Sequence, residues 1–203
     1  MCSLGMMLKI GLTGGIGTGK TTTLELFREN GAQIQSADAF VHELLENDRD
    51  VIAKVTDLLG SRVQDDQGKL DRQYIASKVF SDVHLRLALE SIIHPIVQTA
   101  MDEWLREQVG DGIAVAEIPL LFETHNEAMF DATVVVIAEQ EIQLNRLLNK
   151  GLKLEDAQRR MAAQWPLAEK ARRATYIIHN DGSLLELAQE VERVWVILQT
   201  LCG

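Results

Sequence analysis

Short apolar runs alternate along this chain with longer stretches in which apolar residues recur every three or four positions. The short runs predict five β-strands, and the strongest of them, residues 133–137, ends in four consecutive β-branched apolar residues. Runs of this kind are typical of a parallel sheet that helices cover on both faces. The predicted strands span residues 8–12, 32–36, 113–118, 133–137 and 176–179.

Helical spacing accounts for most of the remaining chain. Gly60 closes one predicted helix, and Asp71 opens another because its carboxylate can accept the free N–H groups of a first turn. Pro95 is expected to end the helix before it, since proline lacks a backbone N–H and clashes with the preceding turn. The predicted helices span residues 22–29, 38–46, 51–59, 71–79, 81–94, 96–108, 139–149, 154–164, 167–174 and 183–200.

The alternation of strands and helices predicts a three-layer α/β/α fold around a parallel sheet with right-handed crossovers. Residues 7–47, 110–138 and 175–203 are expected to form this core. Residues 48–109 contain no convincing strand and predict a helical insertion. The helices of residues 139–174 interrupt the alternation again and are expected to form a mobile lid. Both blocks could also be additional packing without a further role.

Composition and charge argue against several classes of protein. The 203 residues are 46% hydrophobic and 25% charged, as in ordinary globular domains, and the formal net charge of −10 argues against a general nucleic-acid binder. No apolar run approaches the ~20 residues that cross a membrane, and the first residues lack the charged start of a secretory signal. Cys2 and Cys202 form neither a metal motif nor a disulfide framework, which favours a reducing, cytoplasmic location. Residues 1–6 are expected to be a loose extension, and the oligomeric state stays open.

The most informative segment directly follows the first predicted strand. Residues 14–21 match the phosphate-binding pattern G-x-x-x-x-G-K-[ST] at every fixed position, and a predicted helix follows, as this motif requires. Backbone N–H groups of such a loop bind phosphates, while Lys20 can reach the β- and γ-phosphates and Thr21 can ligate Mg²⁺. The alternative is an ordinary glycine-rich turn before a helix. The residues expected to hold ATP are Gly14, Gly15, Ile16, Gly17, Thr18, Gly19, Lys20, Thr21 and Thr22.

Further candidates follow strands, because ligands of open α/β sheets bind beyond the carboxyl ends of the strands. Asp38 could accept the proton of an attacking hydroxyl, or it could cap the helix that follows. Glu117 could hold Mg²⁺ through water, or it could be a rim charge without a role. Arg146 could fold over a transferring phosphate or be a solvated helix charge. His94 could bind a ligand or be structural, and the apolar turn of residues 119–123 is suited to lining a pocket.

The pattern argues against a switch GTPase. Residues 57–60 and 65–68 match D-x-x-G by letter, but neither follows a strand, and residues 149–152 lack the aspartate that would recognise guanine. A small kinase that phosphorylates a metabolite fits the length and layout of the chain best. A kinase acting on a nucleoside or nucleotide, and a non-catalytic nucleotide-binding regulator, stay open as alternatives.

Beyond the loop, an ordered set of short motifs extends over most of the chain. The loop alone is generic, whereas L-D-R, H-P and P-L-L-F-E in this order are specific. The motif positions are residues 10–21, 37–38, 68–72, 79–80, 89–96, 119–123 and 163–164, together with Gln143, Arg146, Lys170, Asn180 and Gly182. This ordered set resembles the dephospho-CoA kinase family.

The resemblance implies a P-loop kinase fold with a helical substrate domain over residues 48–109 and a lid over residues 139–174. It also implies transfer of the γ-phosphate of ATP to the ribose 3′-hydroxyl of dephospho-CoA, with Mg²⁺, to give coenzyme A and ADP. Asp38 is then the catalytic base, and Lys20 and Arg146 act on the phosphates. The implied substrate residues are Asp38, Asp71, Arg72, His94, Pro119 and Leu120, with Asn180 at ATP and with Thr21 and Glu117 at the metal. Asp71, Arg72 and His94 could instead serve the architecture of the substrate domain.

Three positions depart from the family pattern. Ser36 replaces the first aspartate of D-A-D, which leaves more of any metal-binding role to Glu117. Residues 149–151 replace a further R-D, and the compact ammonium of Lys150 cannot reproduce the bidentate fork of an arginine. Thr175 stands where the family often has aspartate.

Overall fold

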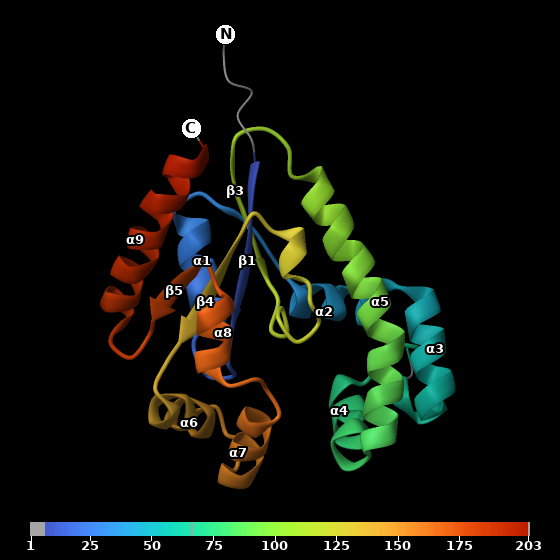
Figure 1. Cartoon of the computed structure of the whole chain (residues 1–203). Coiled ribbons are helices and arrows are strands. Elements are labelled where there is room, and N and C mark those ends of the chain that lie inside the picture. Colours follow the sequence, from blue (N-terminus) through green and yellow to red (C-terminus); the bar gives the residue numbers. More distant parts are fainter. Residues whose placement is uncertain (1–6, 66, 203) are drawn as a thin grey trace. The chain divides into compact units, whose positions relative to one another are not determined.

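The computed structural model describes residues 7–65 and 67–202 (Figure 1). The expected loose extension of residues 1–6, with Cys2, lies outside the described residues. The chain falls into two compact units. The sheet unit runs as far as Ser36 and resumes at Gln108, and the helical unit is Ala37–Glu107.

The sheet unit is built on five parallel strands in the order β2-β3-β1-β4-β5, which confirms the predicted strands. The central strand pairs with β3 on one side, where Met7 faces Gly112, and with β4 on the other, where Ile10 faces Ala132. Because the strands are parallel, their carboxyl ends share one edge of the sheet, where ligands bind in open α/β folds. The strands are β1 (Met7–Gly14), β2 (Gln33–Ser36), β3 (Gly112–Glu117), β4 (Ala132–Ile137) and β5 (Tyr176–His179).

Side chains of the strands alternate between the two faces of the sheet, and helices cover one face with a large apolar core. There the even-numbered residues of β1 pack with α1 (Lys20–Glu29) and α9 (Leu184–Cys202). Phe27 of α1 and Trp195 of α9 meet in this core with their ring centroids 6.5 Å apart. The helix that carries the end of the phosphate-binding motif is therefore fixed to the sheet by its own buried side.

The other face of β1 is covered by the segment between β3 and β4. Gly11 lies against Phe130 and Leu121, and a Cβ at this position would be 2.8 Å from the Phe130 ring. A short 3-10 helix, η2 (Glu127–Met129), belongs to this segment. Three helices then follow β4, as predicted: α6 (Gln140–Asn149), α7 (Leu154–Ala162) and α8 (Leu167–Arg173).

The helical unit has an apolar core of its own, in which Val51, Val55 and Val63 are fully buried. It begins at Ala37, earlier than the expected start of the insertion at residue 48, and α2 contributes Leu45 to this core. Its elements are α2 (Ala37–Asn47), α3 (Arg49–Leu59), η1 (Ser61–Val63), α4 (Arg72–Ser81) and α5 (Val83–Glu107). None of the helices in the described part of the chain is both long and apolar enough to span a membrane.

The prediction that Pro95 ends a helix is wrong, because α5 continues through it without a break. A proline inside a helix removes one backbone hydrogen bond, at a cost of about 3 kcal/mol. Here Leu89 and Ile93 before the proline are buried in the core of the helical unit, and Ile96 and Val97 after it pack against the same core. Tertiary packing on both sides of Pro95 therefore outweighs the local preference to stop.

Candidate active site

The phosphate loop (residues 14–21) joins the end of β1 to the start of α1 in a conformation that needs glycine. Gly17 (φ 80°) and Gly19 (φ 94°) have left-handed backbone, which residues with a Cβ rarely adopt. A Cβ on Gly19 would lie 2.2 Å from the Nδ2 atom of Asn180. The tight turn leaves backbone N–H groups at the positive end of α1, which is the arrangement that binds anionic phosphates.

Gly19→Ala should therefore weaken ATP binding at least about tenfold, because a strained left-handed residue alone costs about 1–3 kcal/mol and Asn180 must also move. The dissociation constant can be measured by isothermal titration calorimetry. Gly31→Ala is a matched control, since Gly31 also has a positive φ (104°) but no atom lies within 4 Å of its added Cβ. Equal ATP affinity of Gly19→Ala and the wild type would contradict this account of the loop.

Two side chains of the loop stabilise its shape by hydrogen bonds to a carbonyl of the same loop. The buried Thr18 donates from Oγ1 to the Gly15 carbonyl at 2.9 Å, and Lys20 Nζ donates to the same oxygen at 3.0 Å. Thr21 and Thr22 are exposed in the first turn of α1. The Lys20 ammonium therefore lies over the loop, as a phosphate-binding lysine requires.

Arg146 and Asn180 hold the carbonyl side of the loop. Arg146 Nη1 lies 3.4 Å from the Gly17 carbonyl oxygen, and Arg146 Nη2 donates to Asn180 Oδ1 at 3.2 Å. The Asn180 side chain, in a residue only 5% exposed, donates from Nδ2 to the Thr18 carbonyl at 2.7 Å. The structure thus brings both predicted residues to the loop, where they contact backbone carbonyls, and it also joins them to each other.

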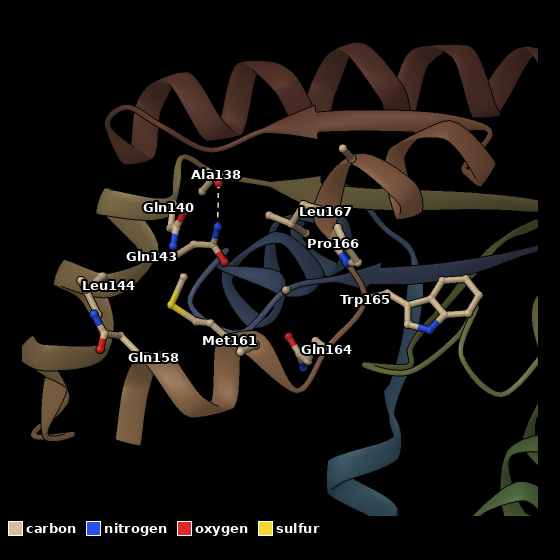
Figure 2. A pocket seen from close by; sticks show the side chains of 13 residues that line it. Ala138, Gln140, Gln143, Leu144, Gln158, Met161, Gln164, Trp165, Pro166 and Leu167 are labelled. Atoms are coloured by element: carbon tan, nitrogen blue, oxygen red, sulfur yellow. Dashed lines mark hydrogen bonds between the residues drawn. The ribbon is translucent and has the colours of Figure 1, made fainter. Parts of the chain in front are cut away.

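Two glutamines of the α6–α8 region lie beside the loop, although the sequence pattern gave them no role. Gln164 Oε1 accepts a hydrogen bond from the Ile16 N–H at 2.8 Å, and the buried Gln143 donates to the Ala138 carbonyl at 2.8 Å. Both lie in the wall of a pocket of about 500 Å³ that reaches Gly15 (Figure 2). Four glutamines and several apolar residues line this pocket, and no charged residue does so in the described part of the chain.

The apolar turn after β3 is tied to α8 by a buried ion pair. Lys170 is fully buried and donates to the Pro119 carbonyl at 3.0 Å, while its Nζ lies 2.8 Å from Glu123 Oε1. Thr13 Oγ1 donates to the same Pro119 carbonyl at 3.2 Å. The side chains of Pro119 and Leu120 are half-buried. In the sequence, Lys170 stood out only as a position that matches the family pattern, and that match assigned it no function.

Glu117 and Thr21 could contribute oxygen ligands to a metal ion. Glu117 is the last residue of β3, is 6% exposed, and stands in register with Leu12 and Ser36 of the neighbouring strands. Within the described ranges there is no group of three or more His, Cys, Asp or Glu side chains that could hold a metal by themselves. Mg²⁺ in phosphoryl-transfer sites usually takes one or two protein oxygens and completes its shell with water and phosphate oxygens. A hydroxyl and one carboxylate fit such a site.

The remaining predicted residues belong to the helical unit. Asp38 is the second residue of α2, so it lies inside the first turn and is not the N-cap. The helix dipole favours a carboxylate at this position. Asp71 caps α4 as predicted, because its Oδ1 accepts the N–H groups of Gln73 at 2.9 Å and Tyr74 at 3.0 Å. Arg72 Nη1 contacts the ring Nδ1 of His42, and His94 is exposed on α5.

Comparison with known proteins decides the family. The family model described as dephospho-CoA kinase matches residues 8–186. A dephospho-CoA kinase of Anaeromyxobacter dehalogenans is 39% identical over 191 residues, which is 93% of this chain and 90% of that protein. The chain belongs to the dephospho-CoA kinase family.

Solved structures support the same assignment. The crystal structure of a Thermus thermophilus protein has a TM-score of 0.78 and 33% identity, and it covers 97% of this chain and 99% of its own. A dephospho-CoA kinase from Campylobacter jejuni has a TM-score of 0.70 and 25% identity, covering 95% and 97%. The resemblance seen in the motifs is therefore confirmed, and the fold is that of a P-loop kinase.

Two departures from the dephospho-CoA kinase pattern have a visible setting. Thr175 donates its N–H to Thr133 Oγ1 at 3.1 Å and accepts the Thr133 N–H at 3.0 Å, which ties β4 to the start of β5. This is a structural role that a hydroxyl can fill. Lys150 is exposed directly after α6, and its backbone N–H bonds the last carbonyls of the helix.

Proposed function

We propose that this chain transfers the γ-phosphate of ATP to the ribose 3′-hydroxyl of dephospho-CoA, giving coenzyme A and ADP. Membership of the dephospho-CoA kinase family supports the substrate. The observation that carries the reaction class is the phosphate loop, in which Lys20 lies over the Gly15 carbonyl and glycines hold the backbone in left-handed turns. That arrangement binds a polyphosphate and stabilises charge on a phosphoryl group in transfer.

The proposed step breaks one bond and forms one. The 3′-hydroxyl oxygen attacks the γ-phosphorus, the bond from that phosphorus to the β–γ bridging oxygen breaks, and ADP leaves. The carboxylate of Asp38 takes the proton of the hydroxyl. Because this transition state is loose, positioning and charge stabilisation by Lys20 and the loop N–H groups contribute more than the base does.

The other site residues have supporting roles in this proposal. Asp71, Arg72 and His94 of the helical unit, with Pro119 and Leu120, contribute to the substrate side. Arg146 and Asn180 keep the phosphate loop in shape through its carbonyls. The helices of residues 139–174 act as the lid that excludes water. Thr21 and Glu117 would hold Mg²⁺, which when bound neutralises charge on the phosphates.

The test is ADP release measured with dephospho-CoA and with a panel of nucleosides and nucleotides. We expect release that depends on dephospho-CoA, and a product phosphorylated at the ribose 3′ position, identified by mass spectrometry and ³¹P NMR. Release that depends only on a nucleoside would assign a different P-loop kinase. Single-turnover experiments with bound ATP and no transfer to any acceptor would instead assign a nucleotide-binding regulator.

A further inference from the structure

Seven residues are linked by hydrogen bonds, an ion pair and chain connections into a ring, which Gly14 and Gly15 of the phosphate loop close. It begins at Thr13, the residue before the loop, and passes through the Pro119 carbonyl to Lys170. Lys170 contacts Glu123, which accepts the backbone N–H of Trp165 at 3.2 Å. Gln164, the next residue along the chain, returns to the loop at the Ile16 N–H. The ring is therefore anchored at both ends of the segment of residues 13–16.

Gln164 and Trp165 of this ring also line the pocket. Figure 2 shows the Gln164 side chain in the stretch between α7 and α8, with Trp165 beyond it. The Trp165 ring packs under Arg173, whose guanidinium carbon is 4.9 Å from the ring centroid. This contact joins the residues before α8 to the last residue of α8. Beside Trp165, the Gln164 side chain accepts the hydrogen bond from the loop.

Lys170 is the centre of the ring, and its burial is costly. Its side chain is 0% exposed and that of Glu123 is 13% exposed, so both charges have lost most of their hydration. A buried ion pair of this kind is often replaceable by apolar residues without loss of stability. In addition, Glu123 Oε2 is buried without a hydrogen-bond partner among the described residues. Stability alone is therefore a poor reason for this pair to be present.

Lys170 does something that an apolar residue could not do. Its ammonium donates to the Pro119 carbonyl and contacts Glu123 at the same time, so it joins the turn after β3 to α8. A shift of α8 would move Trp165 and Gln164, and with them the acceptor of the Ile16 N–H. Displacing a reacting group by about 1 Å can cost 10²-fold in rate, even when the altered residue lies away from the chemistry.

We propose that Lys170 and Glu123 are positioning residues for phosphoryl transfer, which hold the phosphate loop at Thr13 and Ile16 through the ring of contacts described above. The proposal rests on the proposed function for its kinetic consequence. The predicted effect on the loop concerns the nucleotide-free protein and does not depend on the proposed function. Neither residue touches the reacting atoms in this proposal.

The test uses the double variant Lys170→Met with Glu123→Gln, which removes both charges and leaves an acceptor for Trp165. We expect hydrogen exchange of the Ile16 amide in the nucleotide-free protein, measured by NMR, to become at least about tenfold faster. We expect kcat with dephospho-CoA to fall about 10- to 100-fold, while KM for ATP changes less than about fivefold. The control is Arg86→Met with Glu90→Gln, an exposed ion pair of α5 with its atoms 3.8 Å apart and no contact with the ring, which should leave both quantities unchanged.

Each outcome decides the proposal. A folded double variant with wild-type Ile16 exchange and wild-type kcat would overturn it, whatever its melting temperature. If the double variant does not fold, Gln164→Leu tests the same ring at its partly exposed end and should show the same faster exchange and lower kcat. If the wild-type protein does not phosphorylate dephospho-CoA, the proposed function fails, while the exchange measurement still confirms or refutes the ring.

Discussion

Replacing Lys20 by alanine is expected to lower kcat/KM with dephospho-CoA by at least about 10³-fold. The ammonium lies over the loop, 3.0 Å from the Gly15 carbonyl, and carries the positive charge of the motif. Losing one preorganised group that stabilises transition-state charge typically costs 10²–10³-fold, and a cation placed on the transferring phosphate costs more. Steady-state kinetics with a coupled ADP assay measure the effect.

Two further variants make the Lys20 result specific. Lys20→Met keeps much of the side chain's length without its charge, and it should be nearly as inactive as the alanine variant if charge is what matters. Lys54→Met removes an exposed lysine of the helical unit and should leave kcat/KM unchanged. Turnover of Lys20→Ala close to that of the wild type would mean that the loop is only structural.

For Asp38→Asn, kcat should fall about 10²–10⁴-fold, while the dissociation constant for ATP hardly changes. The amide keeps the size of the side chain but cannot accept the proton of the attacking hydroxyl, and loss of a general base has effects of this size. Rapid-quench measurements of the transfer step, with calorimetric titration of ATP, separate chemistry from binding.

A structural role of Asp38 predicts a different result. As a first-turn carboxylate of α2 it would stabilise the helix by about 0.3–1 kcal/mol, which asparagine would forfeit without slowing the transfer step. Glu43→Gln, an exposed substitution on the same helix, controls for the change in charge. Normal turnover with a slightly lower melting temperature would leave Asp38 as a helix residue and remove it from the chemistry.

Most of the fold followed from patterns that are local in the sequence. The β-branched run of β4 and the glycine motif each carry their structure within a few residues, so the sequence located them correctly. Asp71 was likewise found as a cap, because capping needs only the residue and the first turn after it. Pro95 was misjudged because the packing that keeps α5 continuous comes from the rest of the helical unit.

The sequence predicted the phosphate-binding part of the candidate site. It did not predict the contacts by which other side chains hold that part in place. Arg146 and Asn180 were placed near the phosphates, but their contacts with the loop carbonyls depend on partners more than 120 residues away in the sequence. From the sequence alone, Lys170 cannot be distinguished from the other basic residues of its helix. Only the tertiary structure shows that it is buried against the turn after β3. Side chains that hold other site residues leave no local pattern, so sequence alone cannot separate them from the surface.

The central place of β1 has a consequence for the way the chain is made. Both neighbours of this strand, β3 and β4, are encoded more than 100 positions after it, as the pairings of Met7 with Gly112 and Ile10 with Ala132 show. Until β3 and β4 have been translated, the nascent chain therefore has an apolar strand with no sheet to join. Such late closure is typical of slow folding and of a need for protection against premature association during synthesis.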